Sequence, residues 1–280
     1  RRPVRPNFAL EETRRAEAAV AARDAQALES VYRHDVEIVD HMHGVEYGHD
    51  AIVERVRFMI AESSDGAFHH EALATFGDFV LLSRLHGTAS GSTAYGVPRG
   101  ATETVYLLVI EADAPGCARR IDIFAEDKLD DAVVLLYERY AALLPEGPER
   151  ARAAATAHWF AVLQTSNADP ERLAPALAPD IEGVDHRHLS SWSLRGAEAY
   201  LAHGRALHQV ADDVQFCQGE ILALAPNAKL SRTLHRGTDR AGGGVYERAF
   251  LSLFVAGADG RIARAEWFDE DREVEALARF

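Results

Sequence analysis

The sequence predicts an α+β protein made of two tandem copies of one domain, and three observations support this. The chain has 280 residues, enough for one large domain or two of ordinary size. The segment HDVEIVDHMHG (34–44) has a counterpart in PDIEGVDHRHL (179–189). In each half, helix-like patterns come first and strand-like patterns follow, an order typical of α+β domains.

The repeat extends over most of the chain. RLHGT (84–88) resembles TLHRGT (233–238) with one inserted residue, and from residues 103 and 247 the halves align without a gap. A period of half the chain is too long for a solenoid, so it indicates a duplicated domain. The alignment pairs Asp40 with Asp185, His41 with His186, His43 with His188, His86 with His235, Glu103 with Glu247, Tyr106 with Phe250, and Asp122 with Glu266.

In the first half, residues 10–33 are rich in helix formers, with Asp24 placed to cap a second helix. Residues 36–42 alternate apolar and polar side chains, which predicts a strand, and residues 50–63 predict a third helix. Four further strands are expected over 69–77, 78–89, 102–112 and 118–125.

The second half repeats this order. Helices are predicted over 148–166, 168–179 and 197–210, and strands over 214–226, 228–238, 245–257 and 261–269. The segment LLPEGPER (143–150) contains two prolines and a glycine, which suit a boundary. We therefore expect one domain over residues 1–144 and a second over 145–280, with the two halves packed against each other.

Composition narrows the function classes. The chain is 48% hydrophobic and 26% charged, as in ordinary globular proteins. It has no apolar run of the ~20 residues needed to span a bilayer. Its net charge is −14 with no basic stripe, which disfavours nucleic acids and anionic membranes as partners. The two cysteines form no C-x-x-C pair, so a reducing cytoplasm is expected. The chain lacks an initiator Met and a signal peptide, which fits a segment of a longer protein.

The element order, together with VDHMHG (39–44), YGHDA (47–51) and GRIARAEWFD (260–269), resembles the nuclear transport factor 2-like superfamily. The nearest branch is the SnoaL-like polyketide cyclase group. The resemblance covers each half once and implies two tandem cone-like α+β barrel domains that form a pseudo-dimer within one chain. This superfamily includes isomerases, cyclases, hydrolases and binding domains, so the fold does not fix the function. The tandem arrangement also resembles the C-terminal regions of large actinobacterial regulatory proteins.

Asp40 and Asp185 are the first candidate catalytic residues. In the related ketosteroid isomerases the general base occupies the matching position, so the resemblance implies a carboxylate at the mouth of a pocket. The approximate counterparts of that enzyme's second acid are Leu108 and Ser252, which cannot stabilise an oxyanion in the same way, and steroid isomerisation is not expected. The alternative is a strand-end aspartate that holds a loop.

Strand alternation places Asp40 on one face and His41 and His43 on the other, so the three are not expected in one site. The histidines then lie on an outward face, as interface residues or as part of a metal site. No compact ligand motif is present, and we expect neither a metal nor a cofactor. His86 and His235 are either acid–base residues in the pockets or rim residues at strand ends.

Six further residues are candidate ligand contacts. Glu103 and Glu247 begin a strand in each half, and Tyr106 and Phe250 follow three residues later. Asp122 and Glu266 lie two residues after an arginine. Each such pair is either a polar set in the pocket or a structural ion pair.

The leading hypothesis is therefore binding of a small apolar or aromatic ligand, with the chain as the sensory part of a larger regulatory protein. One alternative is a cofactor-independent cyclase, isomerase or hydrolase that uses Asp40 or Asp185 as base. A third is a structural dimerisation module. Further homo-oligomerisation stays open.

Overall fold

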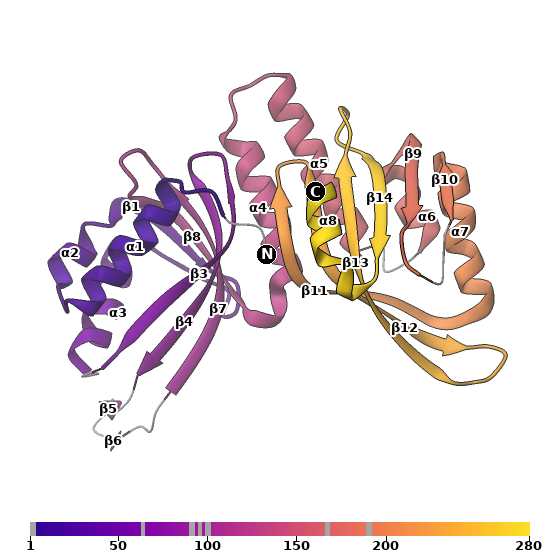
Figure 1. The fold of residues 1–280 in the computed structure, drawn as a ribbon. Helices are drawn as coiled ribbons and strands as arrows, with labels where there is room; N and C mark the ends of the chain where they lie inside the picture. The colour runs from indigo at the N-terminus through magenta and orange to yellow at the C-terminus, as the bar shows by residue number, and fades with distance from the viewer. Residues whose placement is uncertain are drawn as a thin grey trace. The chain divides into compact units, whose positions relative to one another are not determined.

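The computed structural model describes residues 4–62, 65–89, 93–94, 97–98, 102–165, 169–188 and 192–280 (Figure 1). The chain forms two compact units, residues 4–139 and 140–280. Each unit contains a six-stranded sheet accompanied by helices. The predicted fold class, α+β in two tandem copies, is therefore confirmed. The domain boundary expected after residue 144 stays a prediction.

The first unit begins with two helices, two strands and a third helix. They are α1 (Phe8–Ala21), α2 (Ala25–Glu29), β1 (Tyr32–Asp40), β2 (Val45–Tyr47) and α3 (His49–Glu62). The strands β3 (Ala67–Phe76), β4 (Val80–Ala89), β7 (Thr102–Ala112) and β8 (Ala118–Ala125) follow, and then α4 (Leu129–Leu143). A separate two-stranded ribbon is formed by β5 (Thr93–Ala94) and β6 (Val97–Pro98).

The second unit repeats this order. Its elements are α5 (Pro148–Thr165), α6 (Pro170–Leu173), β9 (Leu177–Asp185), β10 (Ser193–Arg195), α7 (Ala197–Val210), β11 (Ala211–Ala225), β12 (Ala228–Asp239), β13 (Val245–Ala256), β14 (Ile262–Phe268) and α8 (Glu273–Arg279). The sheet orders are β2-β1-β8-β7-β4-β3 and β10-β9-β14-β13-β12-β11. In each sheet one pair of strands is parallel, β1 with β8 and β9 with β14. Both sheets are thus mostly antiparallel, as predicted.

Each sheet has two differently covered faces, which we call inner and outer. In the first unit the inner face carries Ile38, Leu108 and Ile121, which pack with Leu10 of α1 and Ile52 of α3. The outer face carries Asp122, which lies 3.6 Å from Arg139 of α4. In the second unit the outer-face residues Leu230, Leu251, Leu253 and Phe268 pack with Ala276 of α8.

Local signals explain where the first helices begin. The side chain of Asn7 accepts a hydrogen bond from the backbone N–H of Leu10 and donates one to the carbonyl of Val80. One residue therefore caps α1 and attaches it to the β3–β4 hairpin. Asp24 caps α2 through the N–H groups of Gln26 and Ala27. In the second unit Asp169 caps α6 through Glu171, with Pro170 in the first turn.

The structure contains elements that were not predicted from the sequence. These are the short strands β2 and β10 and the helices α4 and α8, which end the two units. The predicted linker 143–150 shortens to residues 144–147, between α4 and α5. Residues 63, 166, 168 and 189 of the predicted elements and repeat lie outside the described residues.

Candidate ligand-binding site on the inner sheet face

Asp185 and Arg187 form a closed ion pair at the end of β9. Asp185 is 4% exposed. Its Oδ1 accepts from Arg187 Nε at 2.9 Å, and its Oδ2 accepts from the Arg187 terminal nitrogen at 2.7 Å. The backbone N–H of Arg187 also donates to Oδ1, at 3.0 Å. Both carboxylate oxygens are therefore occupied by one planar guanidinium, which is the strong geometry for such a pair.

Aromatic rings surround this ion pair. The Arg187 guanidinium lies over the ring of Phe250, 5.0 Å from its centroid. Trp267 follows Glu266 on β14 and pairs in register with Asp185, so it shares the inner face. Its ring centroid lies 5.1 Å from that of Trp192 and 5.9 Å from that of Tyr200 on α7. The inner face of the second unit thus joins one neutralised ion pair to several aromatic surfaces.

His235 supplies a second polar group on this face. It is 8% exposed, and its ring stacks on Phe216 at 4.5 Å. The hydroxyl of Tyr246 lies 3.1 Å from its Nε2 atom. Burial lowers the pKa of His235 to about 4, and the nearby guanidiniums of Arg248 and Arg187 act in the same direction. His235 is therefore a neutral imidazole at neutral pH and can donate or accept one hydrogen bond.

A buried hydroxyl pair lies on the same face. Thr233 Oγ1 and Ser252 Oγ are 2.6 Å apart, and Ser231 Oγ lies 3.5 Å from Ser252. Ser252 is 2% exposed. It occupies the position where the sequence resemblance places an oxyanion-stabilising acid in an isomerase, and its first-unit counterpart Leu108 packs in the core. The polar groups of this face thus include hydroxyls, a neutral imidazole, a closed ion pair and the exposed guanidinium of Arg248, which pairs in register with His235.

The corresponding aspartate of the first unit has a different partner. Asp40 is 3% exposed. Its Oδ2 lies 2.8 Å from His43 Nδ1, and its Oδ1 accepts from the backbone N–H groups of Met42 and His43. Burial alone would raise its pKa, but these hydrogen bonds hold the pKa of Asp40 below its ordinary value. Asp40 is therefore an ionised acceptor at neutral pH and a weak base.

This contact corrects one expectation. Strand alternation separated Asp40 from both histidines, but β1 ends at Asp40 and a turn over residues 41–44 returns His43 to the carboxylate. The expectation was wrong for His43. It holds for His41, which lies on the outer face 3.0 Å from Asp122 and stacks on Phe124. The DHxH motif is thus divided between the two faces of the sheet.

The candidate residues fall on both faces of each sheet. Strand pairing and packing place Tyr106 on the inner face with Asp40, and Phe250 and His235 on the inner face with Asp185. The outer face carries the remaining five, which are His86, Glu103, Asp122, Glu247 and Glu266. Glu103 and Glu247 are exposed. Their suggested role as ligand contacts stays a prediction.

His86 and His235 are not equivalent. Val109 and Leu253 are equivalent positions in the repeat, and they pair with Leu82 and Leu230 respectively. Leu82 is therefore the counterpart of Leu230, and four residues further along each strand the counterpart of His86 is Leu234. The alignment of the two histidines was one residue out of register, and one residue reverses the face of a strand. His86 lies on the outer face, 4.0 Å from Glu71.

Asp122 and Glu266 are centres of ion-pair networks on the outer face. Asp122 contacts Arg120 at 2.9 Å and Arg139 at 3.6 Å, besides His41. Glu266 contacts its own set of two arginines and a histidine, which are Arg264, Arg279 and His186. Both acids are 1% exposed. Of the two roles considered from the sequence, these contacts are those of a structural ion pair.

Several partners of the candidate site were not predicted as such from the sequence. Arg187, Trp192 and Tyr246 each contact a candidate residue or its neighbours, and His43, which was expected on the opposite face, contacts Asp40. Arg187 and His43 lie within the repeated motif itself, two and three residues after the aspartate. That short spacing was the available signal, because a turn brings such neighbours back to the strand end.

The described residues show neither a metal cluster nor a helix suited to a membrane. Among them, no three His, Cys, Asp or Glu side chains are grouped as a metal ion would require. In the same part of the chain, no helix combines the length and apolar character needed to cross a bilayer.

The two units are tandem α+β domains of similar topology, and solved structures resemble them one at a time. An NTF2-like protein from Exiguobacterium is 16% identical and covers 42% of this chain and 98% of its own, with a TM-score of 0.34. A putative SnoaL-like polyketide cyclase from Jannaschia is 13% identical over 43% of this chain and 89% of its own, with a TM-score of 0.36. A protein with a ketosteroid isomerase-like fold from Catenulispora acidiphila is 16% identical and covers 44% of this chain and 85% of its own, with a TM-score of 0.32.

These likenesses concern the fold alone. They carry the family descriptions that the sequence resemblance named, and each covers less than half of this chain. No protein-family model matches the chain, and no curated protein sequence matches it.

Proposed function

We propose that the inner face of the second unit binds a small apolar or aromatic ligand that carries one hydrogen-bonding group. The observation that supports this most directly is the pairing of Asp185 with Arg187 beside Phe250. Because the pair is closed, Asp185 and Arg187 add no uncompensated charge to this aromatic surface. Sites for small molecules typically combine such apolar surface with a few polar groups.

His235 and Tyr246 are the polar group of this proposal. The neutral imidazole and the hydroxyl are 3.1 Å apart, so together they can accept and donate a hydrogen bond. A cationic ligand would have to displace Arg187 from Asp185 or remain unpaired, and either carries a desolvation cost. Another cation of this face, Arg248, is exposed and solvated. A neutral ligand with a hydroxyl or carbonyl group is therefore favoured.

The test uses 2-naphthol as a neutral aromatic probe, titrated into the purified chain and followed by tryptophan fluorescence. Two of the three tryptophans, Trp192 and Trp267, lie at this face. Replacing Tyr246→Phe removes the hydroxyl and keeps the ring, so affinity should fall roughly threefold to tenfold. Absence of binding by the unmodified chain would overturn the proposal.

Glu247→Gln provides the matched control. It changes the next residue of the same strand on the opposite face, where the side chain is exposed, and it should leave the affinity unchanged. If Tyr246→Phe and Glu247→Gln bind the probe equally well, the ligand does not occupy this face.

Proton transfer in the first unit is the second candidate function. The Asp40 carboxylate holds His43 through Nδ1 at 2.8 Å, and the His43 side chain is 70% exposed. A carboxylate that orients an imidazole in this way is a recurring arrangement for a general base, with the second ring nitrogen free to take the proton. The base would then be His43, with Asp40 as its positioning residue.

A general carbon-acid probe, 5-nitrobenzisoxazole, tests this candidate because its ring opens when a base removes one proton. His43→Gln should lower the rate of ring opening at least about tenfold. The control is His188→Gln, since the His188 side chain is similarly exposed at 75% and lies near Asp269 instead. Equal rates in the two variants would eliminate His43 as the base.

A further inference from the structure

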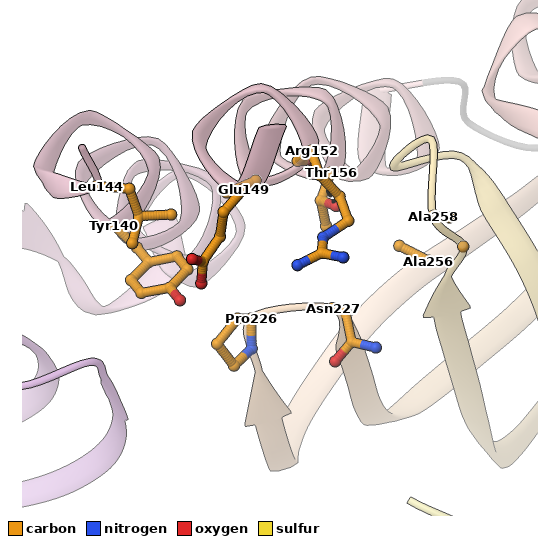
Figure 2. Close-up of a pocket in the computed structure, with 11 residues that line it drawn as sticks. Tyr140, Leu144, Glu149, Arg152, Thr156, Pro226, Asn227, Ala256 and Ala258 are labelled. Atoms are coloured by element: carbon orange, nitrogen blue, oxygen red, sulfur yellow. Dashed lines mark hydrogen bonds between the residues drawn. The ribbon is translucent and has the colours of Figure 1, made fainter. Parts of the chain in front are cut away.

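A cavity of about 570 Å³ lies in the second unit, away from the inner-face site. One wall is the first half of α5, and the opposite wall is formed by the turns after β11 and β13 (Figure 2). Small residues such as Ala153 and Ala256 line it, together with Leu144 and Pro226. The size falls in the range of cavities that hold small molecules.

Two opposite charges line this cavity. Glu149 and Arg152 are one turn apart on α5, and Figure 2 shows both side chains extending from the helix toward Pro226 and Asn227. Within the described part of the chain, neither charged group takes part in a hydrogen bond or an ion pair, although both act electrostatically on Tyr140. The remaining lining residues are uncharged. A carboxylate and a guanidinium are thus offered side by side.

Tyr140 and Asn227 add neutral polar groups. Burial raises the pKa of Tyr140, Glu149 raises it further and Arg152 opposes the rise, so the phenol keeps its proton at neutral pH. The Asn227 amide can both donate and accept hydrogen bonds. A ligand with an ammonium and a carboxylate a few ångströms apart would find a partner for each, and an apolar side chain would contact the small residues.

From this arrangement we infer a second binding site, for a zwitterionic amino acid with an apolar side chain, held between Glu149 and Arg152. The Glu149 carboxylate takes the ammonium group, and the Arg152 guanidinium takes the carboxylate. Both charged side chains are exposed, so the interaction is weak, with a dissociation constant on the order of 1 mM. The site is independent of the proposed function on the inner face.

Calorimetric titration of the purified chain with three related probes tests this inference. L-phenylalanine carries both charges, its methyl ester only the ammonium, and N-acetylphenylalanine only the carboxylate. Each single-charge probe should bind roughly fivefold to tenfold more weakly than L-phenylalanine. Glu149→Gln should weaken L-phenylalanine and the ester but not the N-acetyl form. Arg152→Gln should weaken L-phenylalanine and the N-acetyl form but not the ester.

Arg150→Gln is the control, since it removes a charge from the same helix outside the cavity lining. It should leave all three affinities unchanged, as should Tyr246→Phe at the inner face. The inference is overturned if the unmodified chain shows no binding of L-phenylalanine when the ligand concentration is about ten times the expected dissociation constant. It is also overturned if each charge variant weakens all three probes equally, because Glu149 and Arg152 would then only pair with each other.

Discussion

The imidazole of His186 stacks on Phe268, and its Nε2 atom lies 2.7 Å from Oε2 of Glu266. The first unit repeats this relationship, with His41 stacked on Phe124 and 3.0 Å from Asp122. The second residue of the repeated Asp-His pair therefore holds a buried acid on the outer face of each sheet. An arginine of the unit's last helix, Arg139 or Arg279, completes the contact.

Glu266→Gln should lower the free energy of unfolding by about 1–2 kcal/mol. The carboxylate is 1% exposed and accepts contacts from Arg264, Arg279 and His186, so the variant loses these charge-assisted contacts, while the partly exposed arginines remain solvated. Urea titration measures the loss. Glu247→Gln, an exposed change on the neighbouring strand, should cost less than about 0.5 kcal/mol. Similar losses in both variants would show that the network contributes nothing specific.

Arg187→Met should also destabilise the chain by about 3 kcal/mol, because the buried Asp185 would lose the group that occupies both its oxygens. Combining Arg187→Met with Asp185→Asn removes the unpaired charge, and the double variant should recover part of that loss. Urea unfolding of the single and double variants forms the cycle. A double variant that is less stable than the sum of the single losses contradicts this account.

The burial of Glu12 should make its contribution to stability fall as the pH rises. Its side chain is 2% exposed, and its Oε2 atom has no hydrogen-bond partner among the described residues. Burial raises the pKa of Glu12 to about 8 against an opposing influence of Arg15. The native state therefore keeps a proton that the unfolded chain loses near pH 4.5. The contribution of Glu12 to stability is therefore fully present below that pH and is lost as the pH rises to about 8.

Glu12→Gln should flatten that fall, since the amide has nearly the same shape and does not titrate. Relative to the unmodified chain, the variant should gain a few kcal/mol at about pH 9 and little at about pH 4. Chemical unfolding at a series of pH values gives the two curves. Curves that remain parallel between about pH 4.5 and pH 8 would mean that Glu12 is ionised in the folded protein.

Gly260 occupies a turn that approaches α5 too closely for any side chain. Its φ is +80°, and a Cβ atom there would lie 2.5 Å from the Cβ of Ala155 and 2.7 Å from the backbone nitrogen of Thr156. Gly260→Ala should therefore cost about 3 kcal/mol, from strain and from the clash with the helix. Thermal and urea unfolding measure the change.

Gly243→Ala separates the backbone strain from the steric clash. Gly243 has a φ of +66°, but a Cβ atom at this position would have no neighbouring atom within 4 Å. Only the backbone strain therefore applies, at about 1 kcal/mol. Equal losses at the two positions would contradict the close approach of Gly260 to α5. Gly116, which the repeat aligns with Gly260, also has a positive φ, of +95°.

The helices and long strands were predictable because their signals are local. Apolar periodicity, the capping residues Asp24 and Asp169 and the turn-forming glycines each act over a few neighbouring residues. The short strands β2 and β10 gave no comparable signal, whereas α4, which was not predicted, does carry apolar residues at helical spacing, Ala132, Val133, Leu136 and Tyr137. The two short strands depend on pairing with β1 and β9, and α8 packs on an outer face through long-range contacts.

Strand alternation accounts for the faces on which the candidate residues lie, and their roles stay predictions. Asp40, Tyr106, Asp185, Phe250 and His235 do lie on the inner faces, because strand alternation is fixed once the apolar residues of the strand are buried. The partners of the two aspartates could not be deduced in the same way. They depend on turns in which backbone direction changes, so His43 reaches Asp40 and Arg187 reaches Asp185.

The sequence alone therefore determined that this chain is a duplicated α+β domain, that most of its helices and strands lie where their patterns indicate, and that an aspartate lies in the first long strand of each copy. Only the tertiary structure decided which residues meet. It separated His86 from His235 by one position of strand register and gave the equivalent aspartates different partners. The physical reason is that register and turn geometry are set by long-range pairing and packing, which a local pattern does not contain.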